Sequence, residues 1–185
     1  GLFEMLVEQN INLFKKYDIN RIVTLSPHSY NTFKNDYPRL GGNYQVQHYS
    51  QFLLELIDEG KLHFSKNVNK VVTYHDPCFL GRHNNVYEAP RNVLEAIPGL
   101  TLVEMPRNRE ASFCCGGGGG RMWIVERSEN RVSTIRAREA LNTKPDIIAI
   151  ACPFCHIPPE DGVKTLDEYG NTVVKDIVEL VDDAT

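Results

Sequence analysis

The chain has 185 residues, of which 42% are apolar and 24% are charged, and its formal net charge is −4. This composition is typical of a soluble globular protein that can bury a core without disulfide staples. Lys and Arg are scattered along the chain, which argues against nucleic acid as a partner. No apolar run reaches the ~18 residues that a membrane-spanning helix needs. Because the chain begins with Gly1, we interpret it as a fragment or a processed product, and the absence of a targeting segment carries no weight.

The first third of the chain alternates between helix and strand patterns. Ser26 followed by Pro27 is typical of a helix start, and Ser50 and Gly60 are the expected first and last residues of a later helix. The expected segments are a helix at 2–17, a strand at 21–25, a helix at 26–38, a strand at 43–49 and a helix at 50–60. Together they predict an α-β-α-β-α unit.

A second unit of the same kind follows the polar segment 61–70. Asp76 and Pro77 are expected to end the first strand of this second unit. Trp123 is expected to pack in the core of the unit. The expected segments are strands at 71–75, 100–105 and 146–151, helices at 88–97 and 121–142, and either a strand or a helix at 172–181. Strands separated by helices predict an α/β fold with mostly parallel sheets.

Two parts of the sequence echo each other. "IVTLSPHSYNTFKNDYP" (22–38) and "IIAIACPFCHIPPEDG" (147–162) are both apolar strands followed by X-Pro-aromatic-X, with serine in one copy and cysteine in the other. The alternative is coincidence, because proline is common at helix starts. We therefore expect two related, Rossmann-like α/β halves, pseudo-duplicated, at 1–65 and 66–185.

The cysteines predict a single site. Their odd number and their absence from the first 77 residues do not suit a secreted disulfide framework and indicate a reducing compartment. Each group follows a predicted strand, and the carboxyl ends of parallel strands share one edge of a sheet. The five expected ligands are Cys78, Cys114, Cys115, Cys152 and Cys155.

The residues alone are compatible with several kinds of metal or redox site. The spacing of Cys152 and Cys155 suits either a metal or a thioredoxin-like redox pair, but a redox pair would not require the other three cysteines. Zinc takes four ligands and would leave one cysteine idle, whereas five thiolates favour an iron–sulfur cluster. A phosphate-binding loop fits poorly, because Gly120 is followed by Arg121 and Met122 rather than by Lys and Ser/Thr.

The residues beside the cysteines are expected to support the centre. The N–H groups of Gly116, Gly117 and Gly118 can donate to cluster sulfurs, and a helix starting at Arg121 would direct its positive end toward an anionic cluster. The histidines at the cysteine loops are expected to donate hydrogen bonds to backbone or sulfur, with ligation or catalysis as the less favoured roles. These histidines are His75 and His156.

Other polar residues receive weaker interpretations. Asp76 is expected to act as a turn residue rather than as an acid catalyst. Arg82 and Arg121 either offset cluster charge, contact an anionic substrate, or lie on the solvated surface. His28 and His48 are expected to be structural, and no residue is assigned a catalytic role.

Three segments together resemble a known family. "YHDPCFLGR" (74–82), "SFCCGGGGGRMW" (112–123) and "ACPFC" (151–155) look like the cysteine-rich CCG domain of heterodisulfide reductase-like iron–sulfur oxidoreductases, most of all the D-type chain of that enzyme. The likeness extends over residues 1 to 181. It implies an oxidoreductase in which the five cysteines hold a [4Fe-4S] cluster of noncubane type, although some family copies of the motif hold zinc.

The resemblance also implies what surrounds this chain. Family members exchange electrons with thiols, disulfides, quinones or flavoproteins, and full-length members carry a second CCG repeat, a ferredoxin-like domain and often membrane helices. We therefore expect a C-terminal part of a cytoplasmic enzyme, membrane-associated only through other segments or subunits. Ser26 and Ser29 stand where the first repeat would carry cysteines, so we expect no cluster in the first half. A structural zinc domain that docks partner subunits is the alternative.

Overall fold

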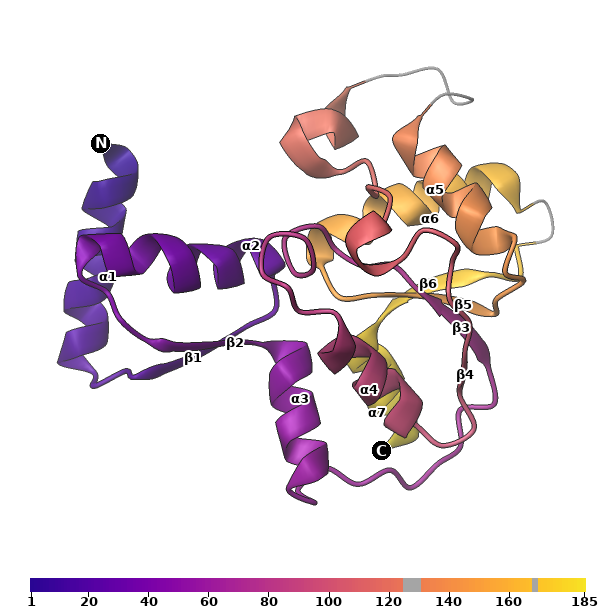
Figure 1. The fold of residues 1–185 in the computed structure, drawn as a ribbon, viewed down its shortest axis with the longest axis horizontal. Helices are drawn as coiled ribbons and strands as arrows, with labels where there is room; N and C mark the ends of the chain where they lie inside the picture. Colours follow the sequence, from indigo (N-terminus) through magenta and orange to yellow (C-terminus); the bar gives the residue numbers. More distant parts are fainter. Residues whose placement is uncertain (125–130, 168–169) are drawn as a thin grey trace.

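The computed structural model describes residues 1–124, 131–167 and 170–185. It contains two parallel sheets, a two-stranded one near the N-terminus and a four-stranded one in the rest of the chain (Figure 1). The first unit consists of α1 (Leu2–Lys16), β1 (Arg21–Thr24), α2 (Pro27–Asn31), the π-helical turn η1 (Thr32–Asp36), the 3-10 turn η2 (Tyr37–Leu40), β2 (Gln45–His48) and α3 (Tyr49–Asp58).

The second unit is built around four parallel strands in the order β4-β3-β5-β6. Its elements are β3 (Val71–Tyr74), α4 (Glu88–Ala96), β4 (Thr101–Leu102), α5 (Val132–Leu141), β5 (Ile147–Ile150), α6 (Ile157–Leu166), β6 (Val173–Asp176) and α7 (Ile177–Ala184). Short 3-10 turns lie at η3 (Arg109–Ala111), η4 (Gly118–Trp123) and η6 (Pro153–Cys155). The α/β class and the parallel pairing agree with the expectation from the sequence.

Helices cover both faces of the four-stranded sheet. One face packs against α4 and α7, and side chains of α3 extend the same core. The other face packs against α5 and α6 through a smaller cluster that includes Ile148, Ala137 and Val163. Successive side chains of a strand point to opposite faces, so the apolar run of β5 is buried on both sides. Within the described ranges, no helix is long and apolar enough to cross a membrane.

The connections diverge at the centre of this sheet. Strand β3 leads through α4 to β4 on one side, whereas β5 leads through α6 to β6 on the other. Neighbouring strands whose connections diverge leave a crevice at their carboxyl ends, which is where ligands bind in open α/β sheets. The loops after β3 and β5 are those that carry Cys78 and Cys152, so the topology brings these cysteines to one edge.

Two expected helix starts are wrong. The capping residue of α3 is His48, whose Nδ1 accepts from the N–H of Ser50, so the helix begins at Tyr49 rather than at Ser50. The expected helix at 121–142 begins only at Val132. The segment Gly118–Trp123 forms the 3-10 turn η4, with positive φ at Gly119 and Gly120, and Ile124 after it is already extended. Residues 125–130 of that prediction lie outside the described residues.

A buried ion pair anchors the end of β3. The expected turn residue Asp76 is only 3% exposed, and its carboxylate accepts from Nη1 and Nη2 of Arg91 at 2.7 and 2.8 Å. The same carboxylate accepts from the backbone N–H of Arg109. Asp76 therefore ties together β3, α4 and the segment that leads to Cys114.

The buried His48 side chain predicts a specific acid sensitivity. His48 is 0% exposed, and burial lowers its pKa to about 4. In the unfolded chain His48 is exposed and binds a proton near pH 6.5, whereas in the folded chain it does so only near pH 4. The free energy of unfolding should therefore fall as the pH is lowered from neutral toward 4. We expect the free energy of unfolding to fall between pH 7 and pH 4 by about 2–3 kcal/mol less in His48→Gln than in the unsubstituted chain. Urea unfolding at both pH values measures it, and equal declines would contradict it.

Candidate metal centre

The structure brings the three cysteine-bearing loops together at the carboxyl edge of the sheet. Cys78 follows β3, and the pair Cys114–Cys115 lies between η3 and η4. Cys152 precedes the turn η6 after β5, and Cys155 is the last residue of that turn. All five are free thiols. Cys115, Cys152 and Cys155 are buried and the other two are partly exposed.

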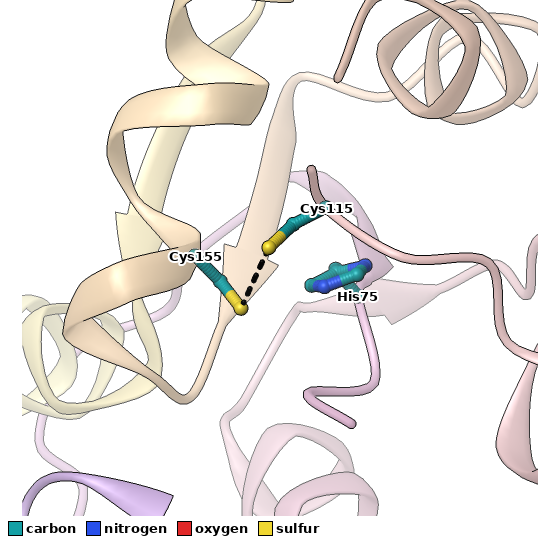
Figure 2. Close-up of side chains that lie close together, drawn as sticks. All are labelled: His75, Cys115 and Cys155. Atoms are coloured by element: carbon teal, nitrogen blue, oxygen red, sulfur yellow. Dashed lines mark hydrogen bonds between the residues drawn. The ribbon is translucent and has the colours of Figure 1, made fainter. Parts of the chain in front are cut away.

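The centre of the group is formed by Cys115, Cys155 and His75. The two sulfurs lie 3.4 Å apart, and a ring nitrogen of His75 lies within 4.8 Å of both (Figure 2). These residues come from three segments that are distant in sequence: the end of β3, the glycine-rich loop and the turn after β5. Cys152 and Cys155 also share a hydrogen bond, which lowers the pKa of Cys152.

The partly exposed thiols belong to the same group. Burial raises the pKa of Cys78, and the nearby charges of Cys115 and Cys152 raise it further. The pKa of Cys114 is raised chiefly by its hydrogen bond to Cys115. Hydrogen bonds from Cys114 and Cys155 lower the pKa of Cys115. Opposite pKa shifts of neighbouring thiols are the response of thiols crowded into one site.

Backbone donors face these sulfurs. The N–H of Gly116 donates to Cys114 Sγ at 3.3 Å, and that of Gly117 donates to Cys115 Sγ at 3.4 Å. Gly116 has φ +89°, and a Cβ on Gly117 would lie 2.9 Å from the carbonyl oxygen of Phe154. Glycine is therefore required here by backbone conformation and by close approach. A Cβ on Gly118 would meet no atom within 4 Å, so its expected role stays a prediction.

The two histidines expected beside the centre differ in placement. His75 is 1% exposed and lies beside Cys115 and Cys155. His156 is partly exposed, and its Nε2 lies 4.0 Å from the carboxylate of Glu160 on α6. The role expected for His156 at the centre stays a prediction.

Sequence reasoning missed Arg136, a buried residue of α5. Its Nε donates to His75 Nδ1 at 3.0 Å, and its side chain is only 1% exposed. An arginine in the middle of a helix is typical of a surface residue, as Arg138 of the same helix is, so no local signal identifies Arg136.

The first unit contributes His28, which was expected to be merely structural. Its ring lies 4.2 Å from that of Phe79 and 5.1 Å from that of Phe154, the residues beside Cys78 and Cys155. Burial lowers the pKa of His28, and the charge of Cys115 opposes this shift. His28, at the start of α2, thus packs against two rings that are next in sequence to Cys78 and Cys155.

An apolar surface borders the cysteines on the other side. Trp123 is 81% exposed, which contradicts its expected place in the core, because the turn η4 holds it above Phe154 rather than against the sheet. Both rings line an open cavity of about 220 Å³ together with Met122, Pro153 and Ile157. On the side of Cys78, Arg82 donates to the carbonyl oxygen of Ser112, and its charge acts to lower the pKa of Cys78.

The donor set suits an iron–sulfur cluster. Five thiols with backbone N–H donors offer soft ligands and hydrogen bonds to sulfur, the combination by which proteins hold and tune such clusters. The buried Nε2 of His75, which has no hydrogen-bond partner in the described part of the chain, adds a polar atom at the same place. Zinc would use only four of these groups.

Comparisons with known proteins agree with an iron–sulfur site. Residues 72–158 match the family described as a cysteine-rich domain, CCG. The chain is 44% identical to the probable iron-sulfur-binding oxidoreductase FadF of Bacillus subtilis, over 97% of this chain and 26% of the relative. It is 43% identical to the EtfAB:quinone oxidoreductase of Syntrophomonas wolfei, again over 97% and 26%.

A third relative is archaeal. The chain is 40% identical to the D-type chain of the dihydromethanophenazine:CoB–CoM heterodisulfide reductase of Methanosarcina barkeri, over 97% of this chain and 44% of the relative. The chain therefore spans between a quarter and a half of the length of these proteins, which are named as oxidoreductases or reductases. The matched segment contains all five cysteines and their loops. Residues 72–158 thus match the CCG cysteine-rich domain model, and the chain as a whole is similar to iron–sulfur-binding oxidoreductase and heterodisulfide reductase chains.

Proposed function

We propose that this chain is an electron-transfer domain in which Cys78, Cys114, Cys115, Cys152 and Cys155 hold a [4Fe-4S] cluster of noncubane type. The observation that carries the proposal is the convergence of all five thiols, from three loops, on one edge of the sheet, where three of them are buried. Four thiols would suffice for zinc or an ordinary cubane, so a fifth thiol in the same group favours a cluster with more thiolate sites. When bound, such a cluster would accept and release single electrons.

The surrounding residues bind and tune the group. The N–H groups of Gly116 and Gly117 stabilise negative charge on Cys114 and Cys115. The rings of Phe79, His28 and Phe154 pack together beside Cys78 and Cys155. N–H donors on sulfur act on the reduction potential of an iron–sulfur centre.

The partners follow from the names of the relatives and from chemistry. Relatives named for quinone and heterodisulfide reduction support a role in thiol/disulfide, flavoprotein or quinone-linked redox chemistry, with ferredoxin-like, flavoprotein or quinone-linked partners. Reduction of a disulfide takes two electrons, so a single cluster needs a second carrier in another domain or subunit. The isolated chain is therefore expected to take up electrons without sustained turnover of a disulfide.

The two units at 1–65 and 66–185 are proposed to be related halves, the first without a cluster. Strands β1 and β2 pair in parallel as β5 and β6 do. In both cases the second strand runs straight into a helix with a capping box, at His48 and at Asp176. His28 of the first copy meets Phe154, its counterpart in the second. These features support a duplication in which Ser26 and Ser29 replace the cysteines.

The proposal is tested by anaerobic reconstitution with iron and sulfide, followed by electron paramagnetic resonance during a redox titration. We expect one paramagnetic species that appears and disappears as a one-electron couple. A chain that binds one zinc ion and gives no signal at any potential would contradict the cluster and favour a structural domain that docks partner subunits.

A further inference from the structure

The imidazole of His75 lies between the cysteines and a buried arginine. Its Nδ1 accepts from Arg136 Nε at 3.0 Å. Its Nε2 is buried and has no hydrogen-bond partner among the residues that the structure describes. The ring lies within 4.8 Å of the sulfurs of Cys115 and Cys155 (Figure 2). One ring nitrogen is therefore engaged, and the other is available to the cysteine group.

The identity of the donor fixes the position of the imidazole proton. A guanidinium offers five N–H groups and no acceptor. The nitrogen that it approaches must therefore present a lone pair, and a neutral imidazole then carries its proton on Nε2. A histidine that binds a metal through Nε2 instead needs an acceptor at Nδ1, usually a carboxylate or a carbonyl oxygen. Arg136 occupies that place with a donor.

Arg136 is itself held from several sides. Its Nη1 donates to Glu139 Oε2 at 3.0 Å and to the carbonyl oxygen of Arg107 at 2.9 Å. Burial lowers the pKa of Arg136 and its pairing with Glu139 opposes this shift, and a guanidinium stays charged in proteins. The backbone N–H and side chain of Arg107 also hold Glu139. The donor that faces His75 is thus fixed in place by a buried network.

We propose that Arg136 is a positioning residue, which holds His75 in its Nε2–H form as a hydrogen-bond donor to the cysteine sulfurs and excludes it from the metal ligands. The Nε2–H tautomer of His75 is expected with or without a bound metal. Its effect on the reduction potential of a cluster rests on the proposed function. N–H donors on sulfur stabilise the more negative, reduced form of a cluster and so raise its reduction potential.

Nitrogen-15 NMR of histidine-labelled, metal-free and reduced chain tests the tautomer directly. His75→Phe assigns the signals of His75. We expect Nε2 to carry the proton in the unsubstituted chain and in Arg138→Met, a control at an exposed position of the same helix. Arg136→Met should give a mixture of tautomers, and Arg136→Lys should restore part of the preference. A proton on Nδ1 in the unsubstituted chain would overturn the proposal, even if Arg136→Met failed to fold.

The cluster-loaded chain provides the second readout. Electron–nuclear double resonance in H₂O and D₂O should show an exchangeable proton near the cluster that is lost in His75→Phe. The midpoint potential should fall in both His75→Phe and Arg136→Met, and most of the Arg136 effect should vanish when His75 is already Phe. A strong coupling between iron and a histidine nitrogen would overturn the proposal. A chain without any cluster signal would contradict the proposed function and leave the NMR test of the tautomer in force.

Discussion

Replacing Cys115 by serine is expected to abolish retention of an iron–sulfur cluster. Cys115 lies at the centre of the group: its sulfur is 3.4 Å from that of Cys155 and accepts the N–H of Gly117. A hydroxyl is a harder and less acidic ligand than a thiol, and soft thiolates are the ligands that iron–sulfur clusters select. Iron and acid-labile sulfide per chain, measured after anaerobic reconstitution and desalting, should fall to background.

The matched substitutions distinguish the proposed ligand set from its rivals. Cys114→Ala should also lose the cluster. If the chain instead used only a thioredoxin-like pair at Cys152 and Cys155, Cys114→Ala would leave its thiol activity unchanged. Ser29→Ala in the first unit serves as the control, because no cluster is proposed there, and it should retain iron as the unsubstituted chain does. Unchanged iron content in Cys115→Ser would show that this residue is not a ligand.

Replacing Arg91 by methionine is expected to lower the free energy of unfolding by about 3–5 kcal/mol, because it leaves a buried carboxylate without its partner. Arg91 and Asp76 are 2% and 3% exposed, and Arg91 Nε also donates to Glu104 at 2.6 Å. Burial, the largest single influence, lowers the pKa of Arg91, but the hydrogen bonds that Arg91 donates to Asp76 and Glu104 outweigh it and raise the pKa. Urea unfolding of the metal-free chain at neutral pH measures the loss.

The control for this prediction is an exposed ion pair. Arg21 and Glu55 are 43% and 32% exposed, and Arg21→Met should lower the free energy of unfolding much less than Arg91→Met, because solvent screens the pair. A loss for Arg91→Met no greater than for Arg21→Met would mean that Asp76 finds another partner. In that case Asp76 would not be the anchor between β3 and the cysteine loops.

The sequence predicted most elements because their signals are local. The apolar run at 146–151 became β5, and Ser26 with Pro27 marks the start of α2, because buried strands and helix starts have short-range requirements. The grouping of the cysteines was also predictable, since each motif follows a strand and the strands are parallel. The spacing of the cysteine motifs and the parallel α/β fold class were together sufficient to predict that the cysteines lie in one group.

The errors arose where tertiary contacts or glycine decide the conformation. The glycine-rich 3-10 turn η4 ends at Trp123 and Ile124 is already extended, so no α-helix begins at Arg121 and Trp123 is left exposed. His48 caps α3 because Nδ1 of its buried ring accepts a hydrogen bond from the backbone N–H of Ser50. Arg136 and Arg91 resemble surface charges in the sequence, and only the packed structure reveals that each is buried against a partner at the end of β3.

The most direct test of the central claim is the metal content of chain prepared and reconstituted without oxygen. Iron, zinc and acid-labile sulfide should be measured on the same desalted sample. Our account predicts about four irons and about four sulfides per chain, with zinc at background, as expected for a [4Fe-4S] cluster. One zinc per chain without sulfide would contradict it and assign the five cysteines to a structural site.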